Sequence, residues 1–159
     1  DVPFCVHGGT AFATGRGEIL KPLPSPPPCW VVLAKPAVSV STKDVYEALD
    51  VASIHFRPDT EGMIRAIEEQ HYDDMCRLTC NVLEEVTMVL HPEVKWYKRL
   101  IRNFGADAVL MSGSGPTVFA LLRRESQVKS LVNAMRGFCR EVYAVRLLGR
   151  AVNLRKSVY

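Results

Sequence analysis

The sequence predicts an α+β fold in which helices pack on one face of an antiparallel sheet. Short apolar runs, typical of buried strands, occur at residues 30–34, 108–111, 118–122 and 142–148. Between these runs lie segments whose apolar residues repeat every three or four positions, as on one face of a helix. The resulting order is strand, helices, strand pair, helix and strand, which is typical of the α+β class.

The first 28 residues predict a separate unit. Residues 1–24 are expected to be extended, with strands at 10–14 and 18–20 around the turn Gly15-Arg16-Gly17. Prolines at 22, 24 and 26–28 then exclude a helix and mark a surface connection. This connection is the best candidate for a boundary between two structural units, residues 1–28 and residues 29–159.

Five helices are expected in the second unit. They cover 42–49 with Ser41 or Thr42 as cap, a stretch from 59 or 60 onward, 72–90, 92–104 ending at Gly105, and 126–136. The long one is predicted to be continuous because Met75, Leu78, Val82, Val86 and Val89 form one apolar stripe. The basic tail 150–159 lacks a period and is expected to be disordered.

Composition excludes several classes of protein. Of the 159 residues, 48% are apolar and 23% charged, which is too apolar for a disordered chain. There is no apolar run of about 20 residues for a membrane helix. The net charge of +3 comes without a dense Lys/Arg run, so we expect no nucleic-acid partner. The chain starts at Asp1 without Met or a signal peptide, which predicts a fragment or processed product of a cytoplasmic protein.

No metal site is expected. The five cysteines have no framework spacing, and Cys76 and Cys80 stand one helical turn apart without paired partners. The four histidines show neither HxxxH nor HExxH spacing. Reduced thiols are therefore the prediction.

Three features are candidates for chemistry. The glycine loop, residues 112–117 (SGSGPT), joins two buried strands and can turn backbone N–H groups outward for an anion. It lacks the ending of a P-loop, and Val118 breaks GxGxxG, so by itself it favours a tight strand connection. Asp1 could act as a general base or be merely solvated. Tyr46, one helical turn after Thr42, could stack on a base or pack against the sheet.

Three stretches together resemble a known family. They are DVPFCVHGGTAFATGRGE at 1–18, Lys35-Pro36 followed by Val40-Ser41-Thr42 and Tyr46, and MSGSGPTVF at 111–119. They resemble the 4-diphosphocytidyl-2-C-methyl-D-erythritol kinases, a family within the superfamily of galactokinase, homoserine kinase and mevalonate kinase. The resemblance extends over essentially all 159 residues. It implies that residues 1–28 are the last hairpin of an N-terminal domain and that residues 29–159 are a C-terminal α+β domain.

The resemblance implies an activity and a site. It implies ATP-dependent phosphorylation of the substrate's tertiary 2-hydroxyl, for non-mevalonate isoprenoid synthesis in the bacterial cytoplasm, with Mg²⁺ as second cofactor. Asp1 would be the catalytic carboxylate, and Thr42 and Tyr46 would bind the cytidine-diphosphate-linked substrate. Gly113, Ser114, Gly115 and Thr117 would support the phosphate-binding loop. Since the family's N-terminal kinase part is missing, we expect this chain to be inactive alone and to associate with that part or with itself.

Two other functions remain open at this stage. One is a kinase of another small alcohol from the same superfamily, which a substrate panel would separate. The other is a non-catalytic α+β binding or interaction module, which predicts no affinity for cytidine nucleotides. A membrane is not expected as a partner in any of these cases.

Overall fold

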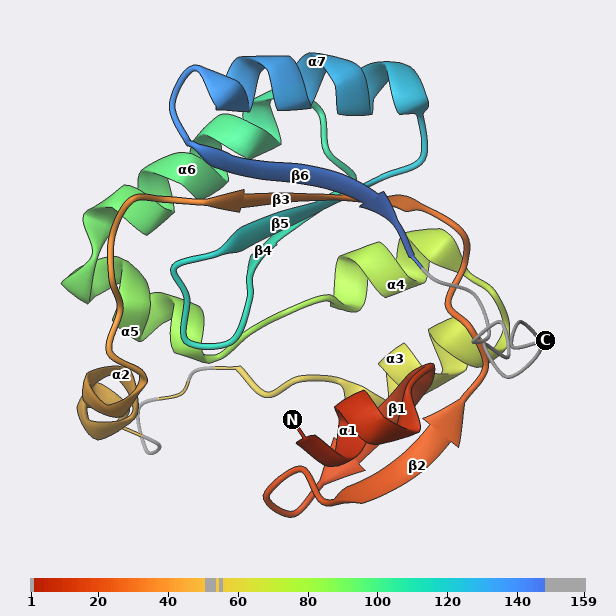
Figure 1. The fold of residues 1–159 in the computed structure, drawn as a ribbon. Coiled ribbons are helices and arrows are strands. Elements are labelled where there is room, and N and C mark those ends of the chain that lie inside the picture. Colours follow the sequence, from red (N-terminus) through yellow and green to blue (C-terminus); the bar gives the residue numbers. More distant parts are fainter. Residues whose placement is uncertain (1, 51–53, 55, 148–159) are drawn as a thin grey trace, which may run out of the picture.

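A four-stranded antiparallel sheet with the strand order β4-β5-β3-β6 forms the centre of the molecule (Figure 1). The computed structural model of the chain describes residues 2–50, 54 and 56–147. The elements are α1 (Val2–His7), β1 (Thr10–Thr14), β2 (Ile19–Leu23), β3 (Trp30–Lys35), α2 (Thr42–Ala48), α3 (Thr60–Glu68), α4 (Tyr72–Leu78), α5 (Leu83–Leu90), α6 (Pro92–Asn103), β4 (Ala108–Met111), β5 (Val118–Leu122), α7 (Glu125–Arg136) and β6 (Glu141–Arg146).

The sheet has two central strands, because β3 pairs with both β5 and β6 and β5 also pairs with β4. In this register Val32 lies opposite Ala120 on one side and Ala144 on the other. Side chains alternate between the faces of a strand, so Val32, Ala34 and Ala120 share one face. That face carries the main core.

The main core joins this face to helices α2, α5, α6 and α7. Among its buried side chains are Val45 of α2, Leu83 of α5, Val94 and Ile101 of α6, and Leu131 and Met135 of α7. Figure 1 shows α6 and α7 on one side of the sheet and α3 and α4 on the other. The predicted α+β class, antiparallel sheet and helix-covered face are confirmed.

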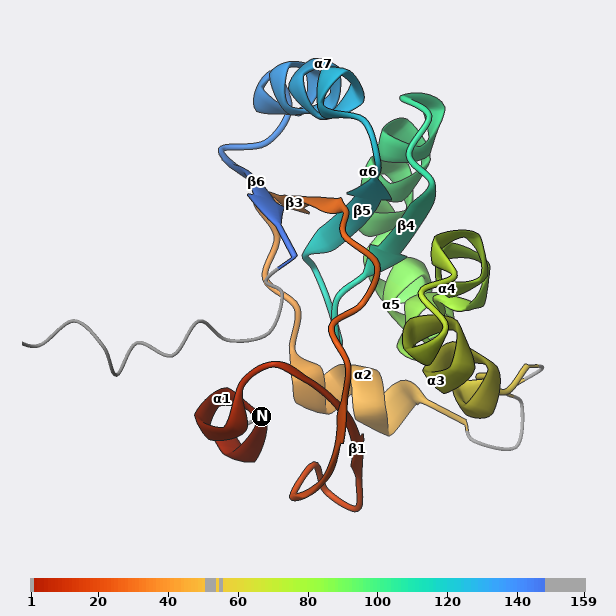
Figure 2. The same cartoon turned by 90° about the vertical axis from the view of Figure 1, so that its right-hand side faces the viewer.

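A smaller apolar cluster lies on the opposite face. Val31 and Leu121 of the sheet pack there with Ala66 and Ile67 of α3 and with Tyr72 and Met75 of α4. Figure 2 shows this pair of helices side by side, next to β4. Helices α3 and α4 therefore add a second layer that the apolar runs alone did not predict.

The predicted hairpin is confirmed, and the extended start is wrong. Strands β1 and β2 form their own two-stranded sheet, with Thr14 opposite Ile19. Pro22 is accommodated because β2 has a partner on only one side. Residues 2–7 form a helix rather than a strand, since Pro3 sits in the first turn, where no N–H is needed. This helix ends at Gly8, whose φ is +68°. The domain division after residue 28 stays a prediction.

The single helix predicted over 72–90 is also wrong. Helix α4 ends at Thr79, which has an extended ψ of 117° and whose hydroxyl donates to the Met75 carbonyl. Helix α5 begins at Leu83. The apolar stripe runs across this break, but Val89 is 80% exposed instead of buried. A local break made by polar side chains leaves the apolar period unchanged, which is why the period did not reveal it.

Other element predictions fit closely. Ser41 caps α2, Asp59 caps α3, and Gly105 follows α6 with a φ of +76°. The last strand ends at Arg146, and Leu148 and the tail 150–159 lie outside the described residues. All five cysteines are free. Among the described helices, none is long and apolar enough to cross a membrane.

Candidate active site at the glycine loop

The glycine loop connects β4 to β5 and is closed by its own backbone. The Ser112 N–H donates to the Thr117 carbonyl at 2.8 Å, and the Gly115 N–H donates to the Ser112 carbonyl at 2.9 Å. Gly113 and Gly115 have φ values of +56° and +91°, which favour glycine. Within the described part of the chain, the N–H groups of Gly113 and Ser114 have no hydrogen-bond acceptor. Two neighbouring open N–H groups fit an anion such as a phosphate.

Helix α2 touches the loop directly. The Thr42 and Ser114 hydroxyls are 2.9 Å apart and share a hydrogen bond. Thr42 is held there because Ser41 caps the helix, its hydroxyl accepting from the Asp44 N–H. The structure thus brings together two predicted site residues that are 72 positions apart in the sequence.

Tyr46 lies one turn further along α2. Its side chain is 59% exposed, whereas the neighbouring Val45 is fully buried in the main core. The ring is therefore not packed into the core and is open to stack on a flat ligand. Its role in substrate binding stays a prediction.

Three polar side chains hold the loop from the α5 side. The Asn81 amide donates to the Met111 carbonyl at 2.9 Å and to the Gly113 carbonyl at 2.7 Å. The hydroxyl of Thr87, which is fully buried, donates to the Ser114 carbonyl at 3.1 Å. Glu84 accepts from the Met111 N–H at 2.7 Å. The carbonyls of Gly113 and Ser114 are thus satisfied by side chains of the protein itself.

Glu84 also anchors α6. Its second carboxylate oxygen pairs with the Lys98 ammonium, and the two side chains are only 12% and 16% exposed. One carboxylate therefore joins the start of the loop, α5 and α6. Partial burial makes such a pair sensitive to the loss of either partner.

Three residues of the site, Asn81, Glu84 and Thr87, were not predicted from the sequence. The whole stretch 72–90 was expected to be one helix that faces the core. A signal was present, because these three polar residues recur every third position and so share a helix face. Which backbone atoms they bind was not readable, since those partners lie 27 to 32 positions away.

Asp1 lies outside the described residues, so its position relative to the loop is not part of this geometry. The described residues contain no group of three or more His, Cys, Asp or Glu side chains that could hold a metal ion.

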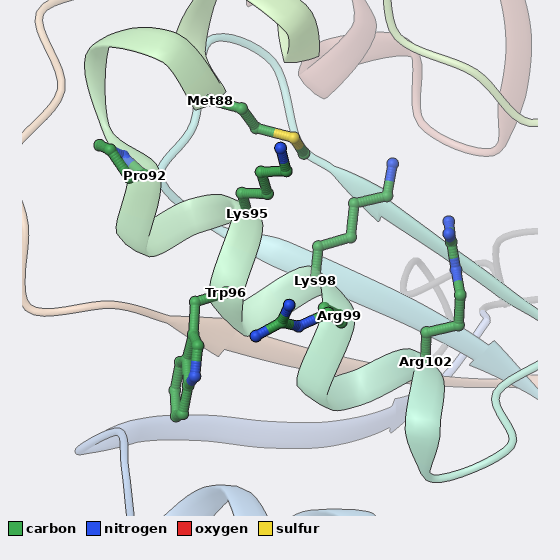
Figure 3. A pocket seen from close by; sticks show the side chains of 7 residues that line it. All are labelled: Met88, Pro92, Lys95, Trp96, Lys98, Arg99 and Arg102. Carbon is green, nitrogen blue, oxygen red and sulfur yellow. The ribbon is translucent and has the colours of Figure 1, made fainter.

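A cavity of about 400 Å³ lies elsewhere, on the outer side of α6 (Figure 3). It is lined by Met88, Pro92, Lys95, Trp96, Lys98, Arg99 and Arg102. Lys95, Lys98 and Arg102 project to one side of the helix and Trp96 to the other. None of the predicted site residues lines this cavity, and we regard it as a separate basic surface.

The glycine loop lies in a segment of the chain that matches a known protein family. The family model "GHMP kinases C terminal" matches residues 58–141, which include the loop and its supporting helices. A solved structure of a 4-(cytidine 5'-diphospho)-2C-methyl-D-erythritol kinase superposes with a TM-score of 0.79 at 32% identity, covering 95% of this chain and 54% of that one. A homoserine kinase from Cytophaga hutchinsonii has the same fold, with a TM-score of 0.69 at 20% identity over 94% of this chain and 50% of that one.

The fold and the matched segment define the class, and the chain belongs to the GHMP kinase family, of which it carries the C-terminal domain. Within this family it is similar to two bacterial proteins named 4-diphosphocytidyl-2-C-methyl-D-erythritol kinase. It is 58% identical to the one from Geobacillus kaustophilus over 97% of this chain and 53% of that protein. It is 58% identical to the one from Bacillus subtilis over 94% of this chain and 51% of that protein. The chain thus spans about half the length of the curated relatives it matches.

Proposed function

We propose that this chain forms the substrate side of a kinase that transfers the γ-phosphoryl of ATP to the 2-hydroxyl of 4-diphosphocytidyl-2-C-methyl-D-erythritol. The observation that carries the proposal is the hydrogen bond between Thr42 and Ser114. It joins the helix that bears Tyr46 to a loop with two open N–H groups. A stacking ring and an anion-binding loop are what a nucleoside diphosphate requires. The identity to kinases of this name supports the same substrate.

The proposed division of roles follows from the chemistry of phosphoryl transfer. This reaction depends mainly on positioning and on stabilising charge on the transferred group. The open N–H groups of Gly113 and Ser114 would stabilise phosphate charge, and Tyr46 would stack on the cytosine. Asp1 would accept the proton of the attacking hydroxyl. ATP and Mg²⁺ are expected cofactors. The described residues contain no cluster of three or more His, Cys, Asp or Glu side chains that could hold a metal ion, and we assign the ion no residue of this chain.

The rest of the kinase is a proposed partner. The family match is to the C-terminal domain, so we expect the missing half to supply the remaining ATP contacts and the 159-residue chain to be inactive alone. Bacterial relatives support a bacterial source, and a cytoplasmic location stays a prediction.

A substrate panel tests the proposal. The chain is completed with the part of the Geobacillus kaustophilus relative that it does not span. It is then assayed with ATP and 4-diphosphocytidyl-2-C-methyl-D-erythritol, homoserine or mevalonate. We expect phosphorylation of the first substrate only and a loss of at least about 100-fold in kcat for Asp1→Asn. Preference for another alcohol would support the rival kinase, and no phosphorylation with no cytidine-nucleotide binding would support the interaction module.

A further inference from the structure

Asn81 occupies an unusual position beside the glycine loop. Its side-chain amide donates two hydrogen bonds, to the carbonyls of Met111 and Gly113, and its oxygen accepts from the Leu83 N–H at 3.0 Å. All of its side-chain hydrogen bonds thus go to backbone atoms. An amide that binds two alternate carbonyls, one at the end of β4 and one in the loop, fixes the orientation of the peptide groups between them.

The geometry of the peptide bond then determines the direction of the Ser114 N–H. In a trans peptide the carbonyl of one residue and the N–H of the next point in opposite directions. Among the described peptide bonds only Gly115–Pro116 is cis, so the Gly113–Ser114 peptide is trans. Because the Gly113 carbonyl points at Asn81, the Ser114 N–H must point away from it.

The direction of the Gly113 N–H is determined by the peptide bond before it. The Ser112 carbonyl accepts from the Gly115 N–H inside the loop, which turns the Gly113 N–H out of the loop. The open N–H groups of the consecutive residues Gly113 and Ser114 are thus both free to bind a ligand. Thr42 meets the loop at the Ser114 side chain, so the same residue offers a hydroxyl contact and an open amide.

We propose that Asn81 is a positioning residue that turns the Ser114 N–H toward a phosphate group of the ligand. This inference rests on the proposed function for the identity of that ligand. The phosphate belongs either to ATP or to the diphosphate of the cytidyl substrate. Asn81 itself touches neither and acts through the loop backbone.

Thr87 provides an internal contrast. Its hydroxyl holds the Ser114 carbonyl, which belongs to the next peptide and sets the Gly115 N–H. That N–H is already used inside the loop, in its bond to Ser112. Loss of the Thr87 hydroxyl is therefore expected to disturb the loop without turning the open N–H groups.

The first test uses the 159-residue chain and does not depend on kinase activity. Backbone amide signals are followed by NMR while inorganic pyrophosphate is added to millimolar concentration. We expect the Gly113 and Ser114 signals to move most in the unaltered chain, and to move at least fivefold less in Asn81→Ser. Serine keeps an acceptor for the Leu83 N–H, so α5 retains its start, but it is too short to reach the Gly113 carbonyl. Asn133→Ser, on the exposed face of α7, is the matched control.

Equal shifts in Asn81→Ser and the unaltered chain would overturn the positioning role. Absence of any shift at Gly113 and Ser114 in the unaltered chain would overturn the anion site. Thr87→Val is expected to leave these two shifts within about twofold, and a loss as large as that of Asn81→Ser would overturn the assignment to Asn81 in particular.

The second test uses the completed kinase. We expect Asn81→Ser to lower kcat at least tenfold, as when a single donor to a charged oxygen is misplaced. A rise in KM for ATP alone would place the phosphate on ATP, and a rise in KM for the cytidyl substrate alone would place it on the diphosphate. Unchanged kcat and KM values would overturn the inference. An inactive unaltered kinase would refute the proposed function instead, while the pyrophosphate titration would still decide the role of Asn81.

Discussion

Gly115 has a backbone φ of +91° and lies against the side chain of Met111. A Cβ added there would come within 2.8 Å of the Met111 sulfur and 3.3 Å of the Thr87 methyl group. Both the backbone conformation and the lack of space therefore demand glycine at this position. Gly113 also has a positive φ, +56°, but a Cβ there would meet open space. A substitution at Gly113 therefore tests backbone strain alone, whereas one at Gly115 tests strain together with crowding.

We predict that Gly115→Ala lowers the free energy of unfolding by about 1–3 kcal/mol, through strain and overpacking together. Gly113→Ala is expected to lower it by only about 1 kcal/mol, since its conformation is the common left-handed one. Urea unfolding of both variants measures the difference. Equal losses would show that the contact with Met111 contributes nothing.

Cys29 is the buried thiol at the start of β3. Its burial, with smaller effects of Cys76 and Asp107, raises its pKa from 9.0 to about 11. The folded chain therefore keeps the thiol proton at a pH where the unfolded chain loses it. The stabilisation from this group is complete below pH 9 and is lost as the pH rises from about 9 to about 11.

We expect the free energy of unfolding to fall more steeply between pH 9 and 11 in the unaltered chain than in Cys29→Ala. The variant loses some packing at every pH, so only the slope is compared. Urea unfolding at a series of pH values provides it. Cys5→Ala is the control, because Cys5 is exposed. Parallel slopes for the unaltered chain and Cys29→Ala would contradict the assignment.

At the scale of elements, Glu84 links α5 to both β4 and α6. Its carboxylate meets the Met111 N–H and the Lys98 ammonium. Removing it leaves one N–H and one partly buried charge without their acceptor. Such losses are larger than those of surface ion pairs.

We predict that Glu84→Ala lowers the free energy of unfolding by about 2–3 kcal/mol. Glu85→Ala is the matched control, because the Glu85 side chain is next to Glu84 in the sequence but is exposed. We expect it to change the free energy of unfolding by no more than about 0.5 kcal/mol. Thermal or urea unfolding of the two variants compares them. Similar small losses of unfolding free energy in both variants would mean that the contacts of Glu84 with Met111 and Lys98 do not stabilise the fold.

The elements also show what could be predicted from the sequence. Ser41, Asp59 and Gly105 act on their own neighbours, so the helix ends they set were predictable locally. The break between α4 and α5 could not be predicted in this way, because the Asn81 amide binds the carbonyls of Met111 and Gly113, about 30 positions away. For the same reason, the glycine loop by itself favoured a tight connection. The family resemblance named Thr42 and the loop as site residues, but it did not predict the hydrogen bond between them. The role of Asp1 stays a prediction.

On the scale of the whole molecule, the segment formed by α1, β1 and β2 exposes apolar side chains. Val2 and Val6 of α1 and Ile19 of β2 are all exposed. Helix α1 has no buried residue, and β1-β2 is a two-stranded sheet, a marginal structure by itself. Figure 1 shows α1, β1 and β2 together at one end of the molecule. This end is where we expect the proposed N-terminal kinase part to pack.

We predict that the 159-residue chain associates with itself as its concentration rises, and that replacing Val2, Val6 and Ile19 together by Ser reduces this association. Sedimentation velocity over a range of concentrations measures it. Val89→Ser is the control, since Val89 is equally exposed but lies on α5. A chain that stays monomeric at all concentrations would contradict the prediction.

The central claim is that the ligand site is built from α2 and the glycine loop. The most direct test is to map the contacts of the cytidyl substrate on the completed kinase by backbone NMR. We predict that the signals of Thr42, Tyr46 and residues 113–117 shift together and saturate together. Shifts confined to Lys95, Arg99 and Arg102 on α6, with the loop unchanged, would contradict the claim and place the ligand in the basic cavity instead.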